Sequence, residues 1–166
     1  NGKDQTVMIV DVGAVMMHIN VLHNNVSVYT REQAFGGAQL TQEIQRRFGL
    51  SVEEAEISKR KGGLPESYEN EVLQPFTQSL STEVARAMQF FTSSTQFNRV
   101  DHIVLAGGCA AISAIDVMVQ DRTQVNTIVA NPFKSMSFGS KVKQQQAVAD
   151  APSLIIACGL AMRGME

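Results

Sequence analysis

Three short stretches place an acid or a pair of glycines directly after a run of apolar residues. In the first, the apolar run Val7–Val10 is followed by Asp11, Val12, Gly13 and Ala14. A glycine there permits a tight reversal, so the Asp11 carboxylate would lie at a strand end beside bare backbone amides. Amides that cradle an anion, with a carboxylate facing a cation or a water, suit a magnesium-bound phosphate. The same pattern also fits an ordinary hairpin, and these residues alone leave both readings open.

The other two stretches carry paired glycines where helices are expected to begin. Gly36 and Gly37 follow Phe35, and Gly107 and Gly108 follow the apolar run Ile103–Ala106. Glycine lets the backbone approach a ligand closely, and the N-terminus of a helix attracts anions. Three such turns in one chain therefore point to a nucleotide site built from strand ends. Taken singly, each glycine pair also fits a simple entry into a helix.

The elements that must position these turns follow from the apolar pattern. Three strands are expected over residues 6–12, 14–23 and 26–35, and they form an antiparallel meander. Helices are expected over 38–48 and 51–61, the second beginning with a capping box of Ser51 and Glu54. A long helical stretch over 68–94 is expected to kink or divide at Pro75. The remaining expected elements are a strand over 103–106, a helix over 109–121, a strand over 127–130, a surface loop over 134–148 and a buried helix over 153–163 that Asp150 caps.

This order predicts an α/β fold with a mixed five-stranded sheet and helices on both faces, the layout of a ribonuclease-H-like lobe. We expect residues 1–5 to be a linker or a fragment boundary and residues 6–61 to form the βββαα first part of the lobe. Residues 62–97 would be inserted or subdomain helices, because Gly62 to Pro65 interrupts the pattern. Residues 98–166 would complete the lobe as βαβα.

Composition excludes several classes of function. A chain of 166 residues forms one domain or two small lobes. The net charge of -2 and the lack of a basic stripe among aromatics argue against nucleic-acid binding. No apolar run is long enough to cross a bilayer. Cys109 and Cys158 lie in apolar, alanine-rich stretches and are expected to be buried free thiols. No Ser-His-Asp or Cys-His pattern suggests nucleophilic catalysis.

Several stretches resemble the actin-like ATPases. Asp11–Ala14 is similar to their second phosphate motif, Leu105–Ala111 to their adenosine motif, and Phe35–Thr41 to the turn that approaches the ribose. Further likeness to one family within this group, the PilM type IV pilus assembly proteins related to the division protein FtsA, lies in Tyr29–Gln33, Glu43–Glu54 and Asp150–Ala161. The resemblance runs from about Thr6 to the end. It implies the C-terminal, nucleotide-facing lobe alone, because the sequence has one Asp-x-Gly turn where two lobes would supply two.

The resemblance also implies roles for single residues toward ATP and Mg²⁺. Asp11 would face the magnesium ion and the attacking water, as the one catalytic and metal-binding residue. Gly13 and Ala14 would offer amides to phosphate oxygens. The other expected nucleotide contacts, at the ribose, at the border of the adenosine or at the base, are Gly36, Gly37, Gln39, Glu56, Lys59, Gly107, Gly108, Cys109 and Ile112.

The residues themselves qualify some of these expected contacts. Glu56 and Lys59 lie one helical turn apart, so they also fit an exposed ion pair. Ala38 stands where some relatives have a longer polar residue, which leaves that contact open. Relatives often have an aromatic residue near Cys109 and Ile112, and its absence predicts weaker stacking on the base.

For the whole protein, the resemblance implies an ATP-binding scaffold of the inner-membrane platform that assembles type IV pili and supports twitching motility. Its ATPase activity would be slow at most. It would be cytoplasmic and held at the inner membrane through partners. Those partners would be the cytoplasmic tail of PilN, which docks mainly on the other lobe, and further platform proteins; a homo-oligomer is a further option. The alternatives are a self-associating structural module without nucleotide function and the lobe of a small sugar- or acetate-kinase-like enzyme.

Overall fold

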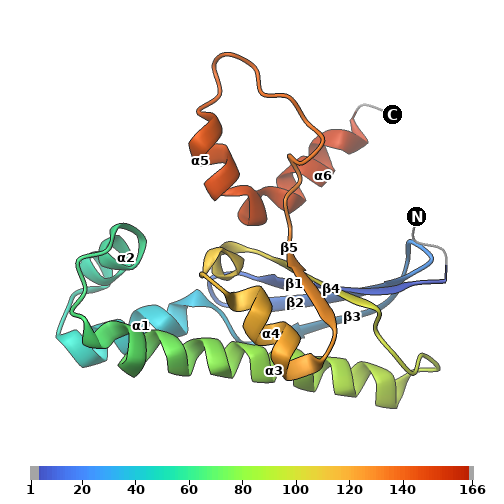
Figure 1. The fold of residues 1–166 in the computed structure, drawn as a ribbon, viewed down its shortest axis with the longest axis horizontal. Helices are drawn as coiled ribbons and strands as arrows, with labels where there is room; N and C mark the ends of the chain where they lie inside the picture. Colours follow the sequence, from blue (N-terminus) through green and yellow to red (C-terminus); the bar gives the residue numbers. More distant parts are fainter. Residues whose placement is uncertain (1–3, 165–166) are drawn as a thin grey trace.

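A single mixed sheet organises the part of the chain that the computed structural model describes, residues 4–164 (Figure 1). Most of the predicted linker at residues 1–5 lies outside the described residues. The strands are β1 (Thr6–Val12), β2 (Met17–His23), β3 (Val26–Gln33), β4 (His102–Ala106) and β5 (Asn126–Val129), in the order β3-β2-β1-β4-β5. β1 pairs antiparallel with β2 and parallel with β4. The predicted five-stranded mixed α/β fold is confirmed.

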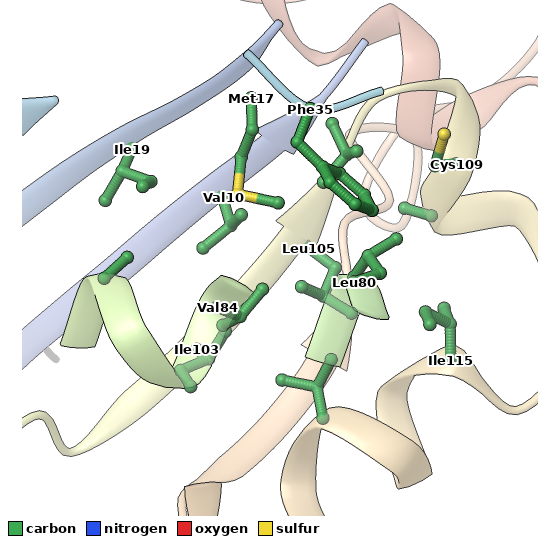
Figure 2. Close-up of a cluster of buried hydrophobic side chains, with 14 of the residues drawn as sticks. Val10, Met17, Ile19, Phe35, Leu80, Val84, Ile103, Leu105, Cys109 and Ile115 are labelled. Carbon is green, nitrogen blue, oxygen red and sulfur yellow. The ribbon is translucent and has the colours of Figure 1, made fainter. Parts of the chain in front are cut away.

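One face of the sheet is the hydrophobic core. In β1, Met8 and Val10 are fully buried, whereas Val7 and Ile9 on the opposite face are only half-buried. An unbroken apolar run suits a strand buried on both faces, but the second face of β1 is only partly covered. Helices α3 (Gln74–Ser94) and α4 (Ile115–Thr123) supply side chains to the same core as the strands, as Figure 2 shows for Leu80, Val84 and Ile115.

The first helix after β3 buries one apolar face, and the second begins with a cap. α1 (Gly37–Phe48) buries Leu40 and Ile44 and ends at Gly49, whose φ of 67° is left-handed. α2 (Val52–Lys61) begins with the predicted capping box. The Ser51 hydroxyl accepts from the Glu54 amide at 3.2 Å, and the Glu54 carboxylate accepts from the Ser51 amide at 2.8 Å.

The expected interruption at Pro75 takes the form of a π-helical turn, η1 (Glu69–Leu73), directly before α3. Proline has no N–H to donate, so an α-helix must lose one backbone hydrogen bond there. In η1 the Gln74 amide bonds to the Glu69 carbonyl instead, a five-residue step. One apolar stripe of α3 is buried, at Phe76, Leu80, Val84, Ala87 and Phe91.

The helix predicted over residues 109–121 is divided. A 3-10 turn, η2 (Gly108–Ala111), follows β4, and α4 begins only at Ile115. Between them Ala114 has a φ of 58°, a left-handed conformation that no α-helix can pass through. Alanine-rich composition favoured helix over the whole stretch and gave no sign of this break.

The last predicted helix is also displaced from its expected environment. A 3-10 turn, η3 (Ala151–Leu154), is buried at Ala151 and Pro152, and α6 (Ile155–Arg163) then leaves the sheet (Figure 1). α6 has no fully buried residue, and Leu160 is 60% exposed. The prediction of a buried helix capped by Asp150 is therefore wrong on both counts, since that side chain makes no cap hydrogen bond. Cys158 is half-buried rather than buried.

The loop predicted over residues 134–148 is confirmed, with a short helix, α5 (Gln144–Ala149), near its end. None of the described helices is both long enough and apolar enough to cross a membrane. The division of the chain around residues 62–97 stays a prediction.

Candidate nucleotide-binding site

The phosphate-motif turn is a hairpin whose tip faces solvent. The Gly13 amide donates to the Met16 carbonyl at 3.0 Å, so this amide closes the turn. The closure explains why β2 begins at Met17 and not at Ala14. Ala14 and Val15 form the exposed tip, beyond the carboxylate that ends β1.

The turn at Gly36 and Gly37 (the ribose turn) is held against this hairpin by backbone hydrogen bonds. The Gly37 amide donates to the Gly13 carbonyl at 3.0 Å, and the Ala38 amide donates to the Ala14 carbonyl at 2.7 Å. A Cβ atom on Gly36 would lie 2.5 Å from the Ala14 carbonyl oxygen, far inside van der Waals contact. The glycine is therefore a steric requirement of this contact, and helix entry alone does not account for it.

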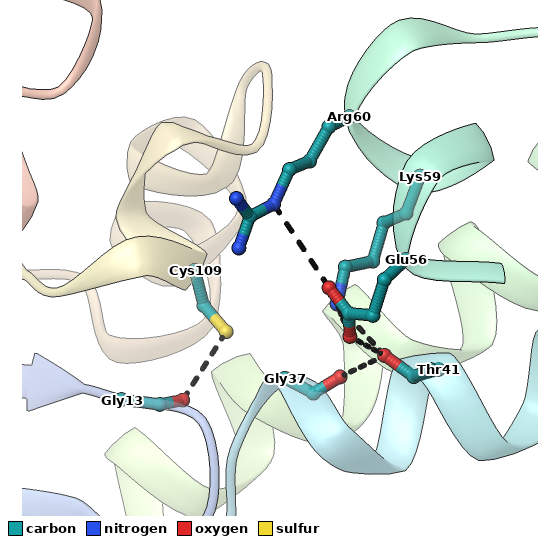
Figure 3. Close-up of polar contacts among 7 residues, drawn as sticks. All are labelled: Gly13, Gly37, Thr41, Glu56, Lys59, Arg60 and Cys109. Carbon is teal, nitrogen blue, oxygen red and sulfur yellow. Dashed lines mark hydrogen bonds and ion pairs between the residues drawn. The ribbon is translucent and has the colours of Figure 1, made fainter. Parts of the chain in front are cut away.

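The turn at Gly107 and Gly108 (the adenosine turn) follows β4 and packs against the same hairpin. Gly107 has a φ of 85°, and a Cβ on it would lie 2.4 Å from both Asp11 Oδ1 and the Val12 carbonyl oxygen. The Cys109 thiol lies 3.7 Å from the Gly13 carbonyl oxygen, which it can reach as a donor (Figure 3). The three turns singled out in the sequence thus converge around Gly13.

Asp11 is half-buried at the end of β1, beside His18 of β2 and Ala106 of β4. Burial raises the pKa of the Asp11 carboxyl above its ordinary value, and the nearby His18 partly offsets this. A bound cation would favour the charged carboxylate. No group of three or more His, Cys, Asp or Glu side chains in residues 4–164 could form a metal cage. One carboxylate nevertheless fits Mg²⁺, which keeps waters and phosphate oxygens as its other ligands.

A polar cluster on α1 and α2 borders the ribose turn. The Lys59 ammonium group donates to Glu56 Oε1 at 2.6 Å and to the Thr41 hydroxyl at 2.7 Å. The Thr41 hydroxyl also lies within hydrogen-bond reach of the Glu56 carboxylate and, at 3.1 Å, of the Gly37 carbonyl (Figure 3). Burial opposes the charge on Glu56, but the bonds from Lys59 and Thr41 outweigh it and lower its pKa.

This cluster is more than the exposed ion pair that one helical turn of spacing allows. The Lys59 side chain is only 20% exposed, and Thr41 is buried. Thr41 was not among the residues singled out from the sequence. Its place one helical turn after Gly37 is the signal that could have found it.

The remaining predicted contacts differ in their surroundings. Cys109 is buried, and its thiol points toward Gly13 and Gly37, behind the turn. Burial raises the pKa of this thiol to about 11. Gln39 and Gly108 are exposed, whereas Ile112 is half-buried against the core.

A sequence profile of the family described as "Type IV pilus assembly protein PilM" matches residues 1–165. The chain belongs to the PilM family. The family resemblance seen in the sequence is thereby confirmed.

Among solved structures, one titled "PilM-PilN type IV pilus biogenesis complex" has a TM-score of 0.83 and 26% identity over 99% of this chain. The ethanolamine utilization protein EutJ from Carboxydothermus hydrogenoformans has a TM-score of 0.67 at 16% identity over 95% of this chain. MreB 5 of Spiroplasma citri bound to AMPPNP has a TM-score of 0.64 at 15% identity over 99%. The last two likenesses show the actin-like fold alone. This chain covers 47%, 49% and 54% of those three chains, about half of each.

Proposed function

We propose that the three converging turns form one wall of an ATP site. The observation that carries this proposal is the packing of Gly36 and Gly107 against the hairpin, where no Cβ would fit. This packing brings the exposed backbone of Ala14 and Gly108 toward the Asp11 carboxylate, an arrangement that suits a phosphate chain and its cation. In this arrangement Asp11 holds Mg²⁺ near the terminal phosphates, and Ala14 at the hairpin tip faces the phosphate oxygens.

The ribose and base would extend away from Asp11 along the other two turns. Glu56 and Lys59 offer a carboxylate and an ammonium group beside Gly37, a pair able to accept from and donate to ribose hydroxyls. Bound magnesium would supply charge neutralisation to the phosphates. The residues of this chain position the nucleotide, and we expect slow hydrolysis at most.

For the whole protein we propose an ATP-binding scaffold of the type IV pilus platform, with a role in pilus biogenesis and twitching motility. Membership of the PilM family and the likeness to a PilM-PilN complex support this role. In this proposal the protein is cytoplasmic and is held at the inner membrane by the PilN tail and other platform proteins. The tail would dock mainly outside these 166 residues, on the other lobe.

One wall should bind nucleotide weakly. Each charge-assisted phosphate contact contributes on the order of a kcal/mol or more, and about 4 kcal/mol separates micromolar from millimolar affinity. We expect calorimetry on this chain to detect no Mg-ATP binding tighter than about 100 μM. Amide shifts in an NMR titration to about 10 mM should concentrate at the hairpin tip and the two glycine pairs. Shifts confined to other surfaces, or none, would overturn the proposal.

A specific observation also favours self-association. Ile156, Leu160 and Met162 of α6 are each more than half exposed, and apolar surface of this kind drives contacts between molecules. We propose that α6 packs against a second copy at high concentration. Light scattering should then give a mass that rises with concentration in the unaltered chain and stays monomeric in Leu160→Glu. A concentration-independent monomer would rule this out.

A further inference from the structure

The 3-10 turn η3 lies against the adenosine turn, although neither sequence pattern nor motif links the two. The Gly107 amide donates to the Pro152 carbonyl oxygen at 2.9 Å. Ala151 is 1% exposed and Pro152 is buried, so the turn is anchored in the core on its inner side. Its backbone is closed by a hydrogen bond from the Ser153 amide to the Asp150 carbonyl at 2.9 Å. The position of η3 is therefore set by the adenosine turn.

Ser153 is the residue of η3 that faces outward at this contact. A Cβ on Gly108 would lie 4.0 Å from Ser153 Oγ, its one neighbour within that distance. Gly108 and Ser153 are both exposed, so the hydroxyl borders open space beside a bare glycine. In residues 4–164 no group is hydrogen-bonded to this hydroxyl, and the thiol of Cys109, the residue that follows Gly108, points inward.

We propose that Ser153 lines the base-binding end of the site and contacts the nucleobase. The inference rests on the proposed function, because it takes the phosphates to lie at the hairpin tip and the ribose at Gly37. The base then extends over Gly108, where Ser153 is the side chain that meets it. A hydroxyl both donates and accepts, so Ser153 binds the polar edge of a base without sorting adenine from guanine.

The test separates base contact from phosphate contact in the full chain. Ser153→Leu fills the space over Gly108 without adding an aromatic face on which a base could stack, and we expect saturation transfer from protein to the adenine protons of Mg-ATP to fall at least about fivefold. The affinity for Mg-tripolyphosphate, which has no base, should stay within about twofold of the unaltered chain. Ser153→Ala should weaken Mg-ATP binding by about two- to fivefold, the effect of losing one hydrogen bond.

The matched control is Ser140→Leu, which adds the same side chain to an exposed loop position and should change the binding of neither ligand. Thermal unfolding of each variant checks that it is folded. Equal loss of Mg-ATP and Mg-tripolyphosphate binding in Ser153→Leu would mean distortion of the site and would overturn the inference. Unchanged saturation transfer would overturn it as well, while Mg-ATP binding by the unaltered chain leaves the proposed function intact. If that chain binds neither ligand, both proposals fail.

Discussion

Gly107 and Asp11 are packed so closely that a side chain on the glycine would overlap the carboxylate. The position of a Cβ on Gly107 lies 2.4 Å from Asp11 Oδ1, and the φ of 85° is one that other residues rarely adopt. The glycine of the adenosine turn and the acid of the phosphate turn therefore constrain each other. Their contact ties the turn after β4 to the end of β1 and so to the stability of the fold.

Gly107→Ala should destabilise the fold more than alanine at other glycines. We expect a loss of about 2–4 kcal/mol in the free energy of unfolding, since backbone strain and overlap both act. Gly49→Ala, with a φ of 67° but nothing within 4 Å, isolates the strain and should cost about 1 kcal/mol. Gly139→Ala has open space and no positive φ, and should lie within about 0.5 kcal/mol. Urea unfolding of the three variants measures the series, and equal losses would contradict it.

Asp11→Asn should raise stability while it weakens magnesium binding. Because burial raises the pKa of Asp11, the folded state holds the proton more tightly than the unfolded state, and the charged form destabilises the fold at neutral pH. The neutral amide removes that cost, so the melting temperature should rise at pH 7. The gain should shrink as pH falls through the raised pKa and vanish below the ordinary carboxyl value, where Asp11 is protonated in both states. Melting curves measured across this pH range test the prediction. A stability gain that grows toward acid pH would contradict it.

Ser51→Ala should loosen the helix that carries Glu56 and Lys59. The variant loses the hydroxyl that accepts from the Glu54 amide, and an N-cap of this type contributes about 1 kcal/mol. Amide hydrogen exchange should accelerate in α2 and stay unchanged in α3. Ser135→Ala, at an exposed loop position, is the matched control. Unchanged exchange in α2 would show that tertiary contacts hold it without the cap.

The two cysteines should differ in their rate of alkylation. Cys109 is buried with a pKa of about 11, so at pH 8 only about one thiol in a thousand is the reactive thiolate. Cys158 is half-buried on α6 and should react first with iodoacetamide. Cys158→Ser should remove the fast phase and leave the slow one, as followed by mass spectrometry. A fast phase that survives in this variant would place Cys109 at the surface.

The local features of the fold could be predicted because their causes lie within a few residues. Alternating or continuous apolar runs mark the strands, and the Ser51–Glu54 box needs only three residues of context. The convergence of the glycine turns followed from strand order, since β1 and β4 run parallel and end at the same edge. The contact of Pro152 with Gly107 could not be predicted this way, because it joins distant segments through backbone atoms that carry no sequence signal.

The environment of α6 was missed for a different reason. Its residues Ile155–Met162 carry no charge and therefore favour an apolar environment. Composition does not indicate which surface provides that environment. The break at Ala114 was missed because helix propensity is a weak prior that tertiary context overrides. The inward-facing thiol of Cys109 likewise depends on which way η2 turns.

The carbonyl group of Gly13 accepts from the Gly37 amide and lies within reach of the Cys109 thiol. One oxygen atom thus contacts the hairpin, the first turn of α1 and the adenosine turn, so these three segments should move as one unit. In the proposed function, movement that accompanies nucleotide exchange would then lie outside this unit, in α2. NMR relaxation measurements on α2 would report that motion, with the three joined turns as the rigid reference.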